Sequence, residues 1–148
     1  MVRSILVGTD GSETASIAVA QAIALAQAVG ARLQIVSAYE PVTAGPRGVG
    51  RLQAPGYTAW PMTPREDALG VLDAARQEAE AAGVGEVETF DRVGDAADAI
   101  IDVAEEQGTD LIVVGHKGMT GATRFLLGSV PNKVSHHAPC SVLIVRTS

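Results

Sequence analysis

The chain has 148 residues, of which 47% are hydrophobic, 3% aromatic and 19% charged, and its formal net charge at pH 7 is −6. The length predicts one domain with a sizeable core. The negative net charge argues against nucleic-acid binding, which normally requires a basic face. The single cysteine, Cys140, excludes an intrachain disulfide, and no apolar stretch is long enough to span a membrane. We therefore expect a cytoplasmic protein that binds neither nucleic acid nor a membrane.

Short apolar runs alternate with helical periodicities along the chain. The run Ser4–Thr9 predicts a strand that ends at the turn sequence Asp10-Gly11-Ser12. Apolar residues at helical spacing from Ala15 to Val29 predict a helix that stops at Gly30. The same criteria predict further strands at Arg32–Ala38, Glu86–Arg92, Leu111–Val114 and Ser141–Val145, and further helices at Thr63–Ala82, Asp95–Gln107 and Ser129–His137. This alternation predicts a single α/β domain: an open, doubly wound, five-stranded parallel sheet with helices on both faces.

The segment Glu40–Met62 interrupts this compact pattern with 23 residues that include four prolines and four glycines. A connection of this length is either a flexible surface loop or a functional lid. Its composition suits a loop, whereas Tyr57, Trp60, Arg47 and Arg51 are side chains that could close over a ligand. Both interpretations stand at this stage.

A glycine-spaced loop follows the strand at Leu111–Val114 and has the spacing G-x2-G-x9-G-S. Glycines let the backbone approach a ligand closely, and a helix that begins at Ser129 adds its positive dipole end. This combination predicts a phosphate site. The backbone donors and cations that would form it belong to Gly118, Gly128, Ser129, Val130, Lys117 and Arg124.

Ligands of open α/β sheets bind beyond the carboxyl ends of the strands, where the strand order reverses. If the first and fourth strands are central neighbours, as in the Rossmann-like order 3-2-1-4-5, the segments Gly8–Ser12 and Gly115–Ser129 meet there. Asp10 is the only acid predicted at this crevice, where it could accept hydrogen bonds from ribose hydroxyls or hold a water molecule bound to Mg²⁺. Its alternative role is to cap the helix that follows.

Motifs for efficient catalysis are absent from the sequence. No G-x-G-x-x-G follows the first strand, no G-x-x-x-x-G-K-[ST] occurs, and no Cys/His set has zinc spacing. His136 and His137 suit the end of a helix, and the carboxylates of Asp95–Gln107 suit a solvated helix face. The residues therefore favour a binding protein over an enzyme.

Two segments, ILVGTDGSE at residues 5–13 and VVGHKGMTGATRFLLGSVPNKVSHHAPCSVLIV at residues 113–145, resemble the universal stress protein family. The resemblance covers nearly the whole chain, and the glycine spacing is similar to that of the family's ATP-binding branch. It implies that Asp10 contacts ribose or a phosphate-bound metal, with Ala38 beside the adenine and Gly8 and Val114 beside the base and sugar. The residues implied around the phosphates are Gly115, Lys117, Gly118, Gly128, Ser129 and Val130.

The resemblance also implies ligands and a partner. ATP with Mg²⁺ is the expected ligand, with cyclic AMP or AMP as alternatives, and a homodimer is expected through Ser141–Val145. The leading hypothesis is a non-enzymatic, adenine-nucleotide-binding stress-response protein that acts as a sensor or regulator. Its competitors are a slow ATP hydrolase or phosphotransferase, for which Asp10 is the only candidate base, and a module that binds no nucleotide.

Overall fold

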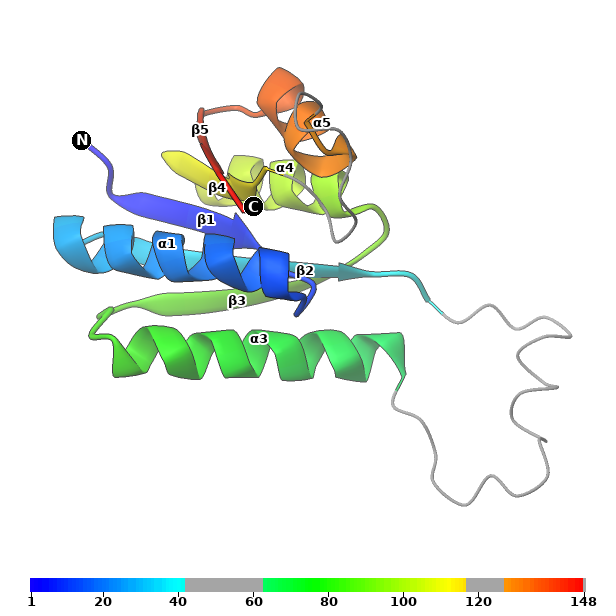
Figure 1. Ribbon diagram of the computed structural model, residues 1–148, viewed down its shortest axis with the longest axis horizontal. Coiled ribbons are helices and arrows are strands. Elements are labelled where there is room, and N and C mark those ends of the chain that lie inside the picture. The colour runs from blue at the N-terminus through cyan, green and yellow to red at the C-terminus, as the bar shows by residue number, and fades with distance from the viewer. Residues whose placement is uncertain (42–62, 117–126, 148) are drawn as a thin grey trace, which may run out of the picture.

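The computed structural model describes residues 1–41, 63–116 and 127–147. Its sheet consists of the parallel strands β1 (Ser4–Gly8), β2 (Arg32–Tyr39), β3 (Val87–Val93), β4 (Leu111–Gly115) and β5 (Ser141–Val145). The strands lie in the order β3-β2-β1-β4-β5 (Figure 1). This arrangement confirms the predicted doubly wound sheet and its order 3-2-1-4-5.

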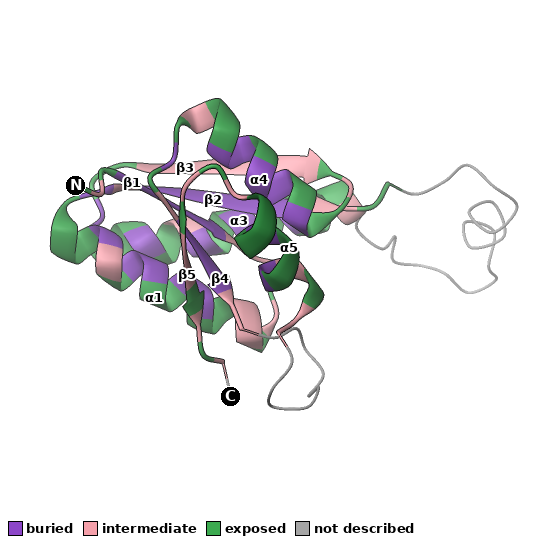
Figure 2. Ribbon diagram, turned by 90° about the horizontal axis from the view of Figure 1, so that it is seen from above, coloured by how far each residue is buried: buried purple, intermediate pink, exposed green. Residues whose placement is uncertain are grey.

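The sheet is covered on both faces by helices, namely α1 (Glu13–Val29), α3 (Pro64–Ala81), α4 (Ala96–Gln107) and α5 (Ser129–His137). Helices α1 and α3 pack on one face and α4 and α5 on the other (Figure 1). In Figure 2 the buried residues of α1 and α4 form the sides of these helices that face the sheet. The protein is therefore a three-layer α/β structure.

The alternation of side chains along each strand divides the core into two clusters. In β1, Ile5 and Val7 pack towards α1 and α3, whereas Leu6 packs towards α4 and α5. Ile112 and Val113 of β4 alternate in the same way. Among the described residues every buried hydrophobic side chain is Ala, Val, Leu or Ile, because a parallel sheet buried on both faces favours aliphatic residues.

The element boundaries differ from the predicted ones by one or two residues. Strand β1 ends at Gly8, although the N–H group of Thr9 still donates to the carbonyl oxygen of Val36 at 2.9 Å. Strand β2 continues to Tyr39, and β3 begins at Val87. These shifts leave the order and type of every predicted element unchanged.

Several predictions lie outside the described residues. The segment at residues 42–62, predicted as a loop or lid, is among them, as are Lys117, Gly118 and Arg124. Over the described part of the chain, no helix combines the length and apolarity that a bilayer crossing requires.

Candidate functional site

A cavity of about 160 Å³ lies at the carboxyl ends of β1 and β4, where the strand order reverses. Strands β1, β2 and β4 form its floor, and the first turns of α1, α4 and α5 form its walls. Most of the residues predicted for the site come together here. They are Gly8, Thr9, Asp10, Ala38, Val114, Gly115, Ser129 and Val130.

The lining of this cavity contains both apolar and polar residues. The apolar residues include Val36, Ala38 and Val114 on the strands and Ile100 on α4, which belong to or pack against the α4/α5 core cluster and are called the apolar slot below. The polar residues are Thr9, Asp10, Ser12 and Thr14, from the end of β1 and the start of α1, and Ser129, from the start of α5. The cavity can therefore accept a ligand that has both an apolar ring and polar groups.

The turn after β1 presents Asp10 at the cavity. Oδ1 of Asp10 accepts a hydrogen bond from the N–H group of Ser12 at 2.9 Å, and Oγ of Ser12 accepts one from the N–H group of Ala15 at 3.2 Å. The N-cap of α1 is therefore Ser12, and the alternative role predicted for Asp10, capping of this helix, is wrong. Oδ2 of the exposed Asp10 side chain makes no hydrogen bond with any described residue and can accept one from a ligand.

The first turn of α5 provides backbone donors at the same cavity. The N–H groups of Ser129 and Val130 belong to the helix start, where they lack acceptors within the helix, and Pro131 has no N–H group. The N–H group of Gly128, predicted to face phosphate, instead donates to the carbonyl oxygen of His116 at 3.1 Å. The described part of the glycine motif thus offers Ser129 and Val130, rather than Gly128, as donors to an anion.

An ion-pair cluster holds α5 against α4. Nζ of Lys133 lies 2.7 Å from Oδ1 of Asp98 and 3.4 Å from Oδ2 of Asp95. The hydrogen bond from the N–H group of Asp98 holds the pKa of Asp95 below its usual range, and Lys133 contributes in the same direction. The positive charge of Lys133 is therefore paired with two carboxylates, and none of these three residues lines the cavity.

Metal binding at this cavity would depend on the ligand. The described residues contain no group of three or more His, Cys, Asp or Glu side chains placed to hold a metal ion. Among them, Asp10 is the only carboxylate that lines the cavity. A magnesium ion here would take one ligand or one bound water from Asp10 and complete its shell with phosphate oxygens and water.

Sequence reasoning missed several cavity residues. Two of them, Ser12 and Val36, carried a signal, because Ser12 follows the predicted turn and Val36 alternates with Ala38 on one face of its strand. For the helix residues the sequence predicted only packing, since helical periodicity does not tell which turn reaches a cavity. The missed residues are Ser12, Thr14, Ala15, Val36, Ala96, Ala99, Ile100 and Pro131.

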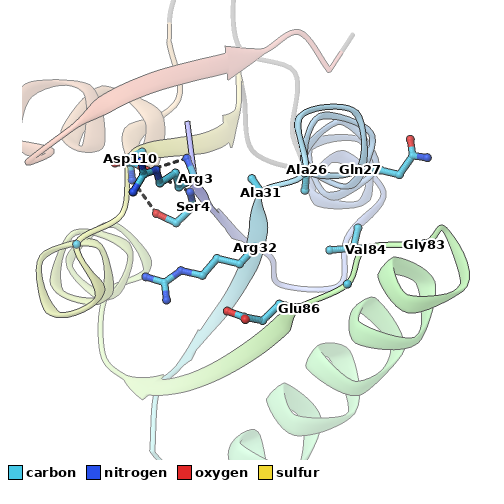
Figure 3. A pocket seen from close by; sticks show the side chains of 13 residues that line it. Arg3, Ser4, Ala26, Gln27, Ala31, Arg32, Gly83, Val84, Glu86 and Asp110 are labelled. Atoms are coloured by element: carbon cyan, nitrogen blue, oxygen red, sulfur yellow. Dashed lines mark hydrogen bonds between the residues drawn. The ribbon is translucent and has the colours of Figure 1, made fainter. Parts of the chain in front are cut away.

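A larger hollow of about 830 Å³ lies at the opposite, amino-terminal edge of the sheet (Figure 3). Two of its charged groups already have partners: Asp110 accepts from the N–H groups of Arg3 and Ser4, and Nη2 of Arg32 donates to the carbonyl oxygen of Gln107 at 3.0 Å. Helices α1, α3 and α4 end here, so their negative dipole ends disfavour an anion. The smaller cavity is therefore the better candidate for an anionic ligand.

Comparison with known proteins agrees with this architecture. The model of the universal stress protein family matches residues 1–146. Universal stress protein Rv1636 of Mycobacterium tuberculosis is 38% identical over 146 residues, which span 99% of this chain and 97% of the relative. Among solved structures, a universal stress protein in complex with cAMP is 37% identical with a TM-score of 0.74 and 99% coverage of both chains. Universal stress protein UspA of Lactobacillus plantarum is 26% identical with a TM-score of 0.76 and 98% coverage of both chains. This chain belongs to the universal stress protein family.

Proposed function

We propose that this protein binds an adenine nucleotide, with ATP as the leading ligand, and acts as a non-enzymatic sensor or regulator in a stress response. The observation that carries the proposal is one cavity, at the reversal of the strand order, that is lined both by the apolar slot and by the N-terminus of α5. An apolar slot suits a purine ring, and a helix N-terminus suits phosphate. The crystal structure of the 37% identical relative with cAMP supports a nucleotide of the adenine class.

The polarity of the cavity orients the proposed ligand. The base lies against Ala38 and Val114, and the phosphates lie at the N–H groups of Ser129 and Val130. Asp10 accepts from the ribose hydroxyls or from a water molecule on Mg²⁺. If the chain belongs to the ATP-binding branch, as we propose, then Gly115, Lys117 and Gly118 also contact the phosphates, and Arg124 is a further cation of the same predicted loop.

Cyclic AMP is the second candidate ligand. The relative in complex with cAMP supports this ligand. The described donors also favour it, because the two backbone N–H groups of Ser129 and Val130 can balance the single negative charge of a cyclic phosphate better than the several charges of a triphosphate. The acidic side chain of Asp10 opposes additional negative charge unless a cation is bound. The relative affinities for ATP and cyclic AMP, with and without Mg²⁺, therefore distinguish the two ligands.

The two edges of the sheet differ in a way that supports a homodimer through β5. Each edge strand exposes a large hydrophobic side chain, Val93 on β3 and Ile144 on β5, but β3 also carries Glu88, Asp91 and Arg92, whereas Ser141–Val145 has no charged residue. Charged side chains protect an edge strand from pairing, and an uncharged apolar edge invites it. We therefore include pairing of β5 with its copy in the proposal, to be tested by sedimentation of the wild type and the I144K variant.

The test of nucleotide binding is a calorimetric titration of nucleotide-stripped protein with ATP, AMP, cyclic AMP and GTP, each with Mg²⁺ and with EDTA. Micromolar binding of an adenine nucleotide, with GTP at least tenfold weaker, supports the proposal. Failure of every adenine nucleotide to bind would reject it. Steady formation of ADP that is lost in D10N, while binding is retained, would favour the hydrolase instead.

The role of Asp10 is resolved by two matched variants. D10N removes the carboxylate that lines the cavity, and E13Q removes an exposed carboxylate from the first turn of α1 that does not line it. If Asp10 holds a magnesium-bound water, D10N weakens ATP binding with Mg²⁺ but not with EDTA. If Asp10 contacts ribose, D10N weakens binding equally in both conditions. E13Q should bind like the wild type in every case.

A further inference from the structure

Gly8 of β1 and Ile100 of α4 make a close contact at the apolar end of the cavity. A Cβ atom added to Gly8 would lie 2.7 Å from Cδ1 and 3.0 Å from Cγ1 of Ile100. Both residues line the cavity, and Ile100 is only 3% exposed. The side chain of Ile100 therefore occupies the space that any side chain at position 8 would need.

Ile100 differs from the other residues of the apolar slot in how its truncation would change the size of the slot. Val36 is held in register beside Gly8 by the parallel pairing of β1 and β2, and Val114 is paired with Ile144 of β5. The side chains of Ala38 and Ala99 end at Cβ, so they can be shortened only to glycine, which would also alter the flexibility of the backbone. Ile100 is the branched side chain of α4 that lines the cavity and lies against position 8, and its truncation enlarges the space beside Gly8.

The helix that carries Ile100 is also held in place. The ion pairs of Lys133 with Asp95 and Asp98 join the first turn of α4 to α5. These ion pairs are half exposed and add little stability, but Ile100 itself is buried in the α4/α5 core cluster, so its side chain cannot withdraw from the cavity without disrupting that packing. Close-packed interiors respond to changes of even one methylene.

We propose that Ile100 is a specificity-determining residue that sets the depth of the slot for the purine base. This inference rests on the proposed function and adds to it the residue that limits the size of the base. The volume of about 160 Å³ is below that of cavities that enclose a whole drug-sized ligand, so the enclosed part accommodates one ring system. A base that is larger at the edge facing Ile100 is excluded by this side chain.

The test compares affinities for AMP and for AMP analogues that carry a benzyl or similar bulky group at N6, C2 or C8. We expect I100A to improve the ratio of analogue to AMP affinity at least tenfold over the wild type for one of these positions. The matched control is I101A, which truncates the next residue of α4, buried in the same core cluster but outside the cavity. I101A should keep the ratio of the wild type. If I100A binds AMP and gains for none of the analogues, or if I101A gains equally, the inference is wrong.

A second measurement checks the contact without any ligand. In thermal unfolding, G8A should lower the midpoint, because its Cβ meets Ile100, and I100A should remove part of this loss in the double variant. The milder I100V variant deletes Cδ1 alone and replaces I100A in all assays if that protein does not fold. Strictly additive effects of the Gly8 and Ile100 changes would show that the two residues do not touch and would overturn the inference. Failure of the wild type to bind any adenine nucleotide would overturn the proposed function, and the role of Ile100 with it.

Discussion

Gly11 connects the end of β1 to the start of α1 and allows a specific prediction about the turn that carries Asp10. Its φ is +82°, and an added Cβ would lie 2.8 Å from Cγ2 of Val71 on α3. G11A therefore incurs a left-handed backbone penalty of about 1–2 kcal/mol and a packing penalty of about 1–3 kcal/mol. Restriction of the unfolded chain offsets roughly 0.4–1 kcal/mol of this loss. We expect a net loss of about 1–5 kcal/mol in the free energy of unfolding.

The packing penalty of G11A is large because the side chain of Val71 has little rotamer freedom. A β-branched side chain in a helix has one strongly preferred χ1 rotamer, so its methyl group cannot move away as the end of a long chain can. G30A provides the matched control, since Gly30 has φ +71° at the end of α1 and no atom lies within 4 Å of an added Cβ. G30A should lose only the left-handed backbone penalty less the unfolded-chain offset, a net loss of about 1 kcal/mol.

The assay is urea unfolding followed by circular dichroism for the wild type, G11A, V71A, G11A/V71A and G30A. The double variant should recover the packing part of the G11A loss once the effect of V71A alone is subtracted. If G11A and G30A unfold at the same urea concentration, Val71 moves aside without cost. That result would refute the steric argument and leave only the left-handed conformation of Gly11 as the source of the loss.

Two further predictions concern the ends of other elements. Oγ1 of Thr63 accepts a hydrogen bond from the N–H group of Glu66 at 3.1 Å, so T63A should reduce the free energy of unfolding in urea by about 1 kcal/mol, and T63S should restore most of it. Asp110 accepts a hydrogen bond from the N–H group of Arg3 at 2.8 Å, and this bond is the main cause of its lowered pKa. Since the folded pKa is below the unfolded value of about 3.9, this stabilisation is complete above that pH and is lost as the pH falls through the folded pKa. In thermal melts, D110N should be less stable than the wild type at pH 7 and approach it below pH 4, whereas a constant difference would contradict the assignment.

The sequence predicted the elements and their arrangement because local patterns and general rules of sheet topology determine both. The apolar run at Leu111–Val114 favours a buried strand, the helical spacing from Ala15 to Val29 favours a helix, and the alternation of such segments favours parallel strands. The carboxyl ends of adjacent strands then bring Gly8, Asp10 and Ser129 together, although they are distant in sequence. The sheet order and the meeting of these residues at one cavity, which both follow from the order of the elements along the chain, therefore agree with the structure.

Only the tertiary structure decided which of several suitable groups makes each contact. Asp10 and Ser12 are both good helix caps, and the point where α1 begins assigns the cap to Ser12 and leaves Asp10 at the cavity. Gly128 has the composition of a phosphate donor, but its N–H group donates to His116 because the chain returns beside the end of β4. Ile100 has the same periodicity as any core residue of its helix, and its contact with Gly8 depends on how α4 packs across the sheet. Periodicity specifies the face of a helix that is buried, whereas packing in three dimensions determines which residue on that face meets a ligand.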